Sequence, residues 1–253
     1  MRHSILLAVF AAAPCIAWAQ ADFNWTGTLS PGQTLTIKGV NGSIHAELAS
    51  GPGIEVSAHK TARRSDPASV RIEVAPTSDG VTICSVYPGD TGSDCEPARG
   101  DHSENRDNDV VVDYTVKVPA NVRFAPKTVN GSIVATGLRS DVDAKNVNGN
   151  VRVATSGLVH ASSVNGSLDI TMGVSSWTSP LEFKTVNGSI DLHLPAATNA
   201  EIHAKTTNGS FTSEFPLHAT GNIEPRNMHA TIGGGGSQLE FKTVNGAIAL
   251  HTM

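Results

Sequence analysis

The stretch Leu-Glu-Phe-Lys-Thr-Val-Asn-Gly-Ser-Ile-Asp-Leu-His-Leu, residues 181–194, decides how this chain folds. Apolar residues alternate with polar ones before the pair Asn187-Gly188, and they alternate again after it. Alternation with a period of two is typical of strands that bury one face. Asn and Gly tolerate positive φ angles, so we expect a sharp corner between two strands that both turn their apolar face inward.

The Val-Asn-Gly corner recurs along the chain. Val-Asn-Gly-Ser-Ile first occurs at residues 40–44, and six further copies with small changes follow it. The asparagines of the seven copies are Asn41, Asn130, Asn148, Asn165, Asn187, Asn208 and Asn245. From Asn130 to Asn208 they are 18, 17, 22 and 21 residues apart, and a gap of 37 residues then leads to Asn245. We interpret Asn227 as the corner of a degenerate copy in that gap, so the sequence predicts a repeat architecture.

Two architectures fit this pattern. Asn-Gly pairs can close two-residue hairpins between antiparallel strands, or they can be the corners of a parallel β-solenoid (β-helix). We favour an all-β parallel solenoid with Val-Asn-Gly corner repeats of about 17–22 residues. Identical corners allow the asparagine side chains to hydrogen-bond from coil to coil as a ladder, whereas isolated hairpins gain nothing from identical turns. Hairpins remain the alternative.

The first residues have the features of a secretory signal. An apolar run over residues 5–16 precedes Ala17-Trp18-Ala19, which supplies small residues for cleavage, so we interpret residues 1–19 as a removed signal peptide. No later stretch offers the roughly 20 apolar residues of a transmembrane helix. We therefore expect a periplasmic or secreted protein.

Export brings the chain into an oxidising compartment, so we predict a disulfide between Cys84 and Cys95.

Charge and composition divide the mature chain. Aromatic residues are only 5% of the sequence, so the core has to be built mainly from smaller aliphatic residues. The net charge is −5, and an acidic loop over residues 88–109 carries all of it. The remainder is nearly neutral, which argues against a nucleic-acid partner. We divide the chain into a strand-rich part, 20–120, that contains the acidic loop, and regular repeats, 121–253.

The acidic loop is also a candidate calcium site. Asp107, Asn108 and Asp109 would supply oxygen ligands, although their spacing matches no calcium-loop signature.

The repeats resemble those of a known family. The segments Leu35–Ile44, Val116–Pro119 and Leu239–Ile248, together with the signal peptide, are similar to the bacterial DUF4097 family of proposed adhesins. The resemblance covers nearly the whole mature chain apart from the acidic loop. It implies a β-helical fold and a location at the cell envelope or surface, with adhesion suggested by shape. It brings no catalytic residues to this sequence.

A lysine recurs three residues before most of the repeated asparagines. In a solenoid this position forms a column, in which ammonium groups one coil apart repel by about 1 kcal/mol in water. Such a column is tolerable if the lysines fan out, pair with acids or receive an anionic ligand such as an acidic polysaccharide. The candidate binding residues are Lys127, Lys145, Lys184, Lys205 and Lys242. Alternatively, the lysines only cover apolar surface and prevent aggregation.

The alternative to a binding module is a polysaccharide-active enzyme on the same scaffold. Polysaccharide lyases and hydrolases need convergent acids or bases, and only Asp169 and Asp191 occupy matching positions of consecutive repeats. His193 and His251 share a repeat position, but we place them on coils that are not adjacent and predict no metal site. The favoured function is a binding or structural module of the envelope, without cofactor or catalysis. Its partners would be envelope glycans, an envelope protein or further copies of the chain joined through the solenoid ends.

Overall fold

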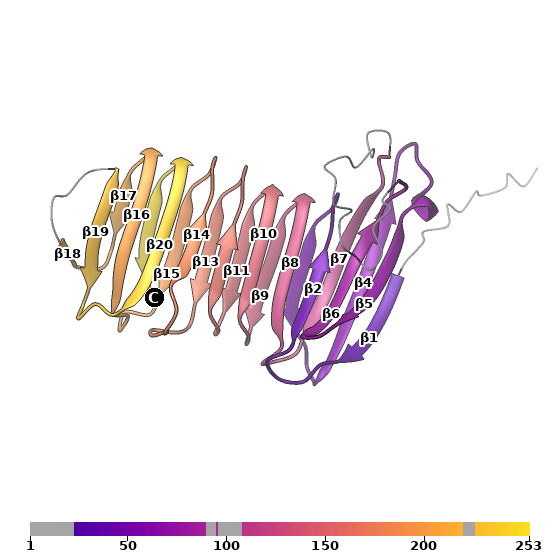
Figure 1. Ribbon diagram of the computed structural model, residues 1–253, viewed down its shortest axis with the longest axis horizontal. Helices are drawn as coiled ribbons and strands as arrows, with labels where there is room; N and C mark the ends of the chain where they lie inside the picture. Colours follow the sequence, from indigo (N-terminus) through magenta and orange to yellow (C-terminus); the bar gives the residue numbers. More distant parts are fainter. Residues whose placement is uncertain (1–22, 90–94, 96–107, 220–225) are drawn as a thin grey trace, which may run out of the picture.

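The structure, a computed structural model, describes residues 23–89, 95, 108–219 and 226–253. It is an elongated all-β protein in which two long sheets lie face to face (Figure 1). The predicted signal peptide, residues 1–19, lies outside the described residues, as does most of the acidic loop. Within the described ranges, no helix is both long and apolar enough to cross a membrane.

The two sheets are named sheet A and sheet B. In spatial order, sheet A contains β1 (Phe23–Thr28), β4 (Gly53–Thr61), β7 (Val111–Val118), β3 (Ile44–Leu48), β9 (Ile133–Leu138), β11 (Val151–Thr155), β13 (Leu168–Met172), β15 (Ile190–Leu194), β21 (Ile248–Thr252) and β17 (Phe211–Ser213). Sheet B contains β5 (Arg71–Thr77), β6 (Gly80–Val86), β2 (Thr34–Lys38), β8 (Arg123–Asn130), β10 (Val142–Asn148), β12 (Val159–Ser162), β14 (Leu181–Lys184), β20 (Ser237–Asn245), β16 (Ala200–Asn208), β19 (Asn227–Ile232) and β18 (Leu217–Ala219). A short 3-10 helix, Pro67–Ser69, precedes β5.

Each Asn-Gly corner joins a strand of sheet B to a strand of sheet A. The coils made in this way are β2–β3, β8–β9, β10–β11, β12–β13, β14–β15, β20–β21 and β16–β17. Neighbouring coils pair in parallel in both sheets. This pairing confirms the parallel solenoid and contradicts the hairpin alternative at the repeated corners.

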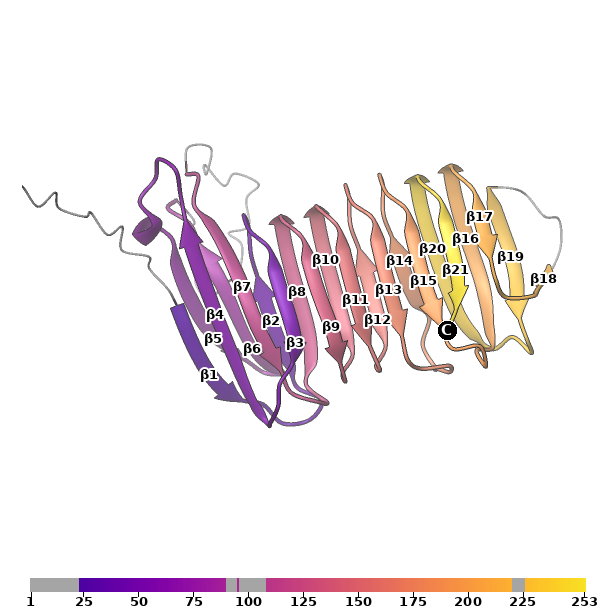
Figure 2. The same ribbon diagram turned by 180° about the vertical axis from the view of Figure 1, so that it is seen from behind.

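The order of the coils departs from the order of the chain at the C-terminal end. Strand β20 pairs with both β14 and β16, so the coil of Asn245 lies between those of Asn187 and Asn208 (Figures 1 and 2). The interpretation of Asn227 as a further coil corner is wrong, because β19 runs antiparallel to β16 and caps the stack. The long gap in the repeat spacing therefore holds a cap rather than a coil.

Antiparallel strands also cap the N-terminal end. Strands β6 and β7 continue the parallel stack beyond β2 and β3, and β5, β4 and β1 then pair antiparallel. A disulfide joins Cys84 of β6 to Cys95 of the acidic loop, with a Cα–Cα distance of 5.6 Å. The Asp109 carboxylate accepts backbone N–H bonds from residues 63–65, and the backbone and side-chain hydrogen bonds of Ser65, with smaller effects of the other two backbone bonds, lower its pKa to about 2. Asp109 thus holds the backbone of residues 63–65 in place. Asp107, another of the candidate calcium ligands, lies outside the described residues.

The core is a thin layer of aliphatic side chains between the sheets. One inward position of sheet A is occupied in successive coils by Ile133, Val151, Leu168, Ile190 and Ile248, all 0% exposed. On sheet B, Phe183 and Phe241 stack with ring centroids 5.5 Å apart. Full burial of such a side chain contributes about 1.5–3 kcal/mol, so each coil depends on its neighbours for stability.

The corner glycines are required mainly by close approach between coils. A Cβ atom on Gly166 or Gly188 would collide with the carbonyl oxygen of the glycine in the neighbouring coil. Gly42 also has a positive φ of 124°, but none of the seven repeated asparagines has one. The expectation that Asn contributes a positive φ to the corner is therefore wrong. Asn is suited to this position by the hydrogen bonds of its side chain.

Candidate ligand-binding face

The predicted lysines lie on the outer face of sheet B in one column, here called the lysine column. In spatial order its members are Lys38, Lys127, Lys145, Ser162, Lys184, Lys242 and Lys205. Lys242 separates Lys184 from Lys205 because the last coil of the chain is inserted there. Adjacent members are one strand apart, about 4.8 Å.

A second column, two residues before the lysine column, carries most of the nearby acids. Its members are Thr36, Ala125, Asp143, His160, Glu182, Glu240 and His203. Sequence analysis missed it, although every member except Ala125 is polar and all lie five residues before a repeated asparagine. The signal was therefore present in the repeat alignment.

Lys184 and Lys242, in the C-terminal half of the lysine column, are neutralised by this acid column, whereas Lys205 makes no ion pair with any described residue. Lys184 contacts Glu182, and Lys242 contacts Glu240 and lies 3.7 Å from Glu182. The hydrogen bond from Lys242 lowers the pKa of Glu240, and the same bond raises the pKa of Lys242. These lysines already have anionic partners.

In the N-terminal half the acid column supplies one carboxylate, Asp143, and Asp79 and Asp141 also line the depression that includes Lys127. Lys145 Nζ lies 2.9 Å from Asp143, and Lys38 Nζ donates to the Cys95 carbonyl oxygen at 2.9 Å. Lys127 makes no ion pair with any described residue. Burial lowers the pKa of Lys127 and the charge of Lys145 lowers it further, while the Asp143 carboxylate partly opposes this effect and Lys38 adds a smaller lowering. An anion beside Lys127 would offset this repulsion, so this half of the column is suited to an anionic ligand.

Two shallow depressions lie beside the lysine column on the same face. One, of about 280 Å³, lies between Lys145 and Lys184, where the small residue Ser162 of β12 occupies the position between the two lysines. The other, of about 460 Å³, extends over β8 and β10 and includes Lys127. Both are lined by Asp143 and His160, so they adjoin at these two residues, and together they are here called the sheet B groove.

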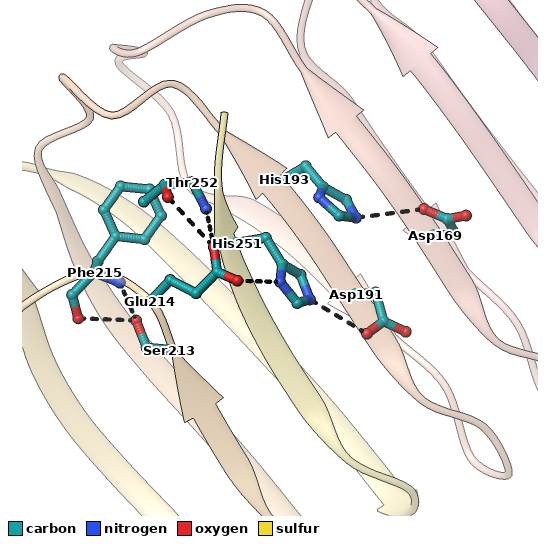
Figure 3. Close-up of polar contacts among 8 residues, drawn as sticks. All are labelled: Asp169, Asp191, His193, Ser213, Glu214, Phe215, His251 and Thr252. Carbon is teal, nitrogen blue, oxygen red and sulfur yellow. Dashed lines mark hydrogen bonds and ion pairs between the residues drawn. The ribbon is translucent and has the colours of Figure 1, made fainter.

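The candidate catalytic acids lie on the outer face of sheet A. Asp169 and Asp191 are directly paired in register on β13 and β15 (Figure 3). Asp169 Oδ2 accepts a hydrogen bond from Arg152 Nε at 2.9 Å, and Asp169 Oδ1 lies 3.8 Å from His193 Nε2. Asp191 Oδ1 lies 3.7 Å from His251 Nε2. Each carboxylate thus has a basic partner on the sheet surface, and neither lines the sheet B groove.

Two histidines meet on this face. His193 and His251 stack with ring centroids 4.6 Å apart (Figure 3). Their predicted placement on coils that are not adjacent is therefore wrong, because β21 inserts directly beside β15. His251 Nδ1 lies 3.1 Å from Glu214 Oε1, and Glu214 also accepts the backbone N–H of Thr252 at 2.8 Å. Across the described part of the chain, no group of three His, Cys, Asp or Glu side chains is arranged to hold a metal ion.

The repeated asparagines form a continuous side-chain ladder along the corner. In spatial order it runs through Asn41, Asn130, Asn148, Asn165, Asn187, Asn245 and Asn208. Each Nδ2 donates to the Oδ1 of the preceding member, with N···O distances of 2.7–2.9 Å. The ladder is exposed, so its role in the solenoid is to align the corners rather than to fill the core.

Comparisons with known proteins give one matching family profile and several similar solved structures. The profile of the Toastrack DUF4097 family matches residues 120–251. A proposed cell adhesion protein from Clostridium sporogenes has a similar structure, with 9% identity, a TM-score of 0.46, and 92% of this chain and 100% of that chain covered. A proposed adhesin from Bacteroides fragilis has 10% identity and a TM-score of 0.42, with coverage of 92% and 98%. No curated protein matches the sequence.

Proposed function

The chain belongs to the Toastrack DUF4097 family, and from this premise we propose that it is an exported, non-catalytic binding module of the cell envelope. In this proposal residues 1–19 are removed on export. Residues 121–253 form the regular binding scaffold, and residues 20–120 form its N-terminal part. The ligand is an acidic polysaccharide held in the sheet B groove beside the lysine column.

The position of Lys127 carries the proposal. It is a half-buried cation between two other lysines, and burial and those lysines lower its pKa despite the opposing effect of Asp143. Partial burial and repulsion by neighbouring cations make this charge unfavourable, and a bound anion would offset that free-energy cost. Three consecutive cations of the column, Lys38, Lys127 and Lys145, repeat at about 4.8 Å per coil, so a polymer with regularly spaced carboxylates or sulfates suits them better than a single ion.

The acids of sheet A favour a non-catalytic protein. Most glycoside hydrolases use two carboxyl groups that flank the scissile bond of a bound substrate. Asp169 and Asp191 instead lie side by side on one sheet, with Arg152 and the stacked histidines as partners. This arrangement is typical of a surface ion network.

Binding to an immobilised acidic polysaccharide tests the proposal. Polygalacturonate serves as the probe and dextran as the neutral control, with purified residues 20–253. We expect retention on polygalacturonate that weakens with salt. The double variant Lys127→Glu/Lys145→Glu should bind at least about tenfold more weakly, because it reverses two charges that face the ligand.

The matched control is the double variant Lys205→Glu/Lys242→Glu, which makes the same charge change at two lysines of the column that line neither depression of the sheet B groove. We expect it to bind within about threefold of the unmodified protein. Equal losses in the two double variants would contradict the assigned site. Release of shortened polymer that disappears in Asp169→Asn or Asp191→Asn would show that the protein is an enzyme instead.

A further inference from the structure

Each of the seven corners contains an Asn-Gly step, and this dipeptide is chemically reactive. The backbone nitrogen of the glycine can attack the side-chain Cγ of the asparagine. The new N–Cγ bond replaces the Cγ–Nδ2 bond, ammonia leaves with the amide proton, and a succinimide ring remains. Water then opens the ring to aspartate or isoaspartate. Glycine favours the attack because it has no side chain to hinder it and is conformationally free.

Six of the seven steps are restrained by the solenoid. In these steps the glycine N–H donates to the asparagine carbonyl oxygen of the neighbouring coil, with N···O distances of 2.7–3.0 Å. The six donors are Gly42, Gly131, Gly149, Gly166, Gly188 and Gly246. The attacking nitrogen is therefore engaged and held against another coil. Within the ladder, rotation of an interior asparagine toward its own backbone would also break two side-chain hydrogen bonds.

The step Asn208-Gly209 lacks most of these restraints. Among the described residues, the Gly209 N–H has no hydrogen-bond acceptor, because its coil is the last of the parallel stack. Asn208 is the final member of the ladder, so its Nδ2 donates to Asn245 at 2.8 Å while its Oδ1 accepts no hydrogen bond from the described chain. Both residues are exposed.

We propose that Asn208 is a site of spontaneous deamidation in the folded protein, and that the other six Asn-Gly steps are protected. The only co-reactant is water. A carboxylate at position 208 has no N–H to donate to Asn245 Oδ1, so the last bond of the ladder is lost. The isoaspartate product also lengthens the backbone by one carbon, which disturbs the pairing of β17 with β21. Deamidation therefore loosens the end coil and leaves the interior coils unchanged.

Peptide mass spectrometry of aged protein tests this proposal. The purified protein is incubated in mildly alkaline buffer and digested at acidic pH, and deamidation is measured at each Asn-Gly step. We expect Asn208 to react at least about tenfold faster than Asn187. The interior step must first break one more side-chain bond and one backbone bond, and two such bonds correspond to about a tenfold change or more.

The same incubation in concentrated urea is the control. Unfolding removes the coil-to-coil bonds, so the seven steps should then react at similar rates. The variant Asn208→Gln should lose the fast reaction of the folded protein while the six remaining steps stay slow. Equal rates at Asn208 and Asn187 in the folded protein, or a faster interior step, would overturn the proposal.

Discussion

The coil of Asn187 and the coil of Asn208 have almost the same corner sequence but different surroundings. The central coil, β14–β15, has parallel neighbours on both sides in both sheets. The end coil, β16–β17, has a parallel neighbour on one side only, and β17 pairs with β21 alone. The repeated residues therefore make different numbers of bonds in the two coils. Local sequence defines a coil, but its neighbours provide most of its stability.

The end coil compensates in part with contacts that no other repeat has. Strand β19 covers the free edge of β16, and Phe215, just after β17, is 5% exposed. The Glu214 side chain binds the end of β21 through Thr252 and His251. These contacts replace some of the contacts that a further parallel coil would make. The predictions below compare the two coils, beginning with the change of largest expected effect.

Removal of an aromatic ring should distinguish the coils most strongly. Phe183 of the central coil is 0% exposed and stacks on Phe241, whereas Phe211 of the end coil is only half-buried. We expect Phe183→Ala to lower the free energy of unfolding by about 3–5 kcal/mol, because it leaves a cavity between two coils. Phe211→Ala should cost about 1–2 kcal/mol. Urea unfolding measures both, and equal costs would show that the end coil is packed as tightly as the centre.

An added methyl group at the corner should have the next largest effect. A Cβ on Gly188 would collide with the carbonyl oxygen of Gly166, and one on Gly209 would collide with that of Gly246. The central coil is fixed on both sides, so we expect Gly188→Ala to cost about 3 kcal/mol of unfolding free energy. The end coil can shift outward, and Gly209→Ala should cost about 1 kcal/mol. A larger cost for Gly209→Ala in the same urea assay would contradict the comparison.

Most of this architecture could be predicted from the sequence, but the order of the coils could not. Alternation around Asn187-Gly188 indicates two strands and a corner, and the recurring motif indicates a parallel stack. Every coil, however, offers its neighbour the same corner, so the motif does not specify which coil lies next to which. The position of the last coil depends on β19, whose antiparallel pairing has no signal in the repeat.

The parts of the candidate site that depend on a single repeat position could be predicted, and the parts that depend on the order of the coils could not. The lysine column was visible because a single repeat position carries it, and the sequence also placed Asp169 beside Asp191 correctly. The stacking of His193 on His251 could not be predicted from the sequence, because it follows from the insertion of β21 beside β15. The ion pairs of Lys184 and Lys242 required two repeat positions to be read together.

Truncation of a ladder asparagine should have a smaller effect. Asn187 has one side-chain hydrogen bond to each neighbouring asparagine, and Asn208 has one bond in total. Each such bond contributes about 1 kcal/mol. We expect Asn187→Ala to lower the free energy of unfolding by about 2 kcal/mol and Asn208→Ala by about 1 kcal/mol. Similar values from urea unfolding would mean that water replaces the lost ladder hydrogen bonds equally well at both positions, so that the second bond of Asn187 adds no stability.

The smallest expected effect concerns the acid that holds the end of the chain. The Thr252 backbone N–H bond lowers the pKa of Glu214 below its ordinary value of 4.5, and His251 lowers it further. Because the folded-state pKa is depressed, the stabilisation is fully present above 4.5 and is lost as the pH falls through the folded-state value. Hydrogen exchange at the Thr252 amide, corrected for intrinsic rates, should therefore show a loss of protection below 4.5.

The variant Glu214→Gln should reduce this protection already at neutral pH and remove its acid dependence, because the amide side chain does not titrate in this range. Glu201→Gln is the matched control, since Glu201 lies on the exposed outer face of β16 in the same coil. It should keep both the protection and the acid-induced loss. If Glu214→Gln retained the same pH dependence, the end of β21 would be held by its backbone pairing with β15 and not by the acid that the end coil supplies.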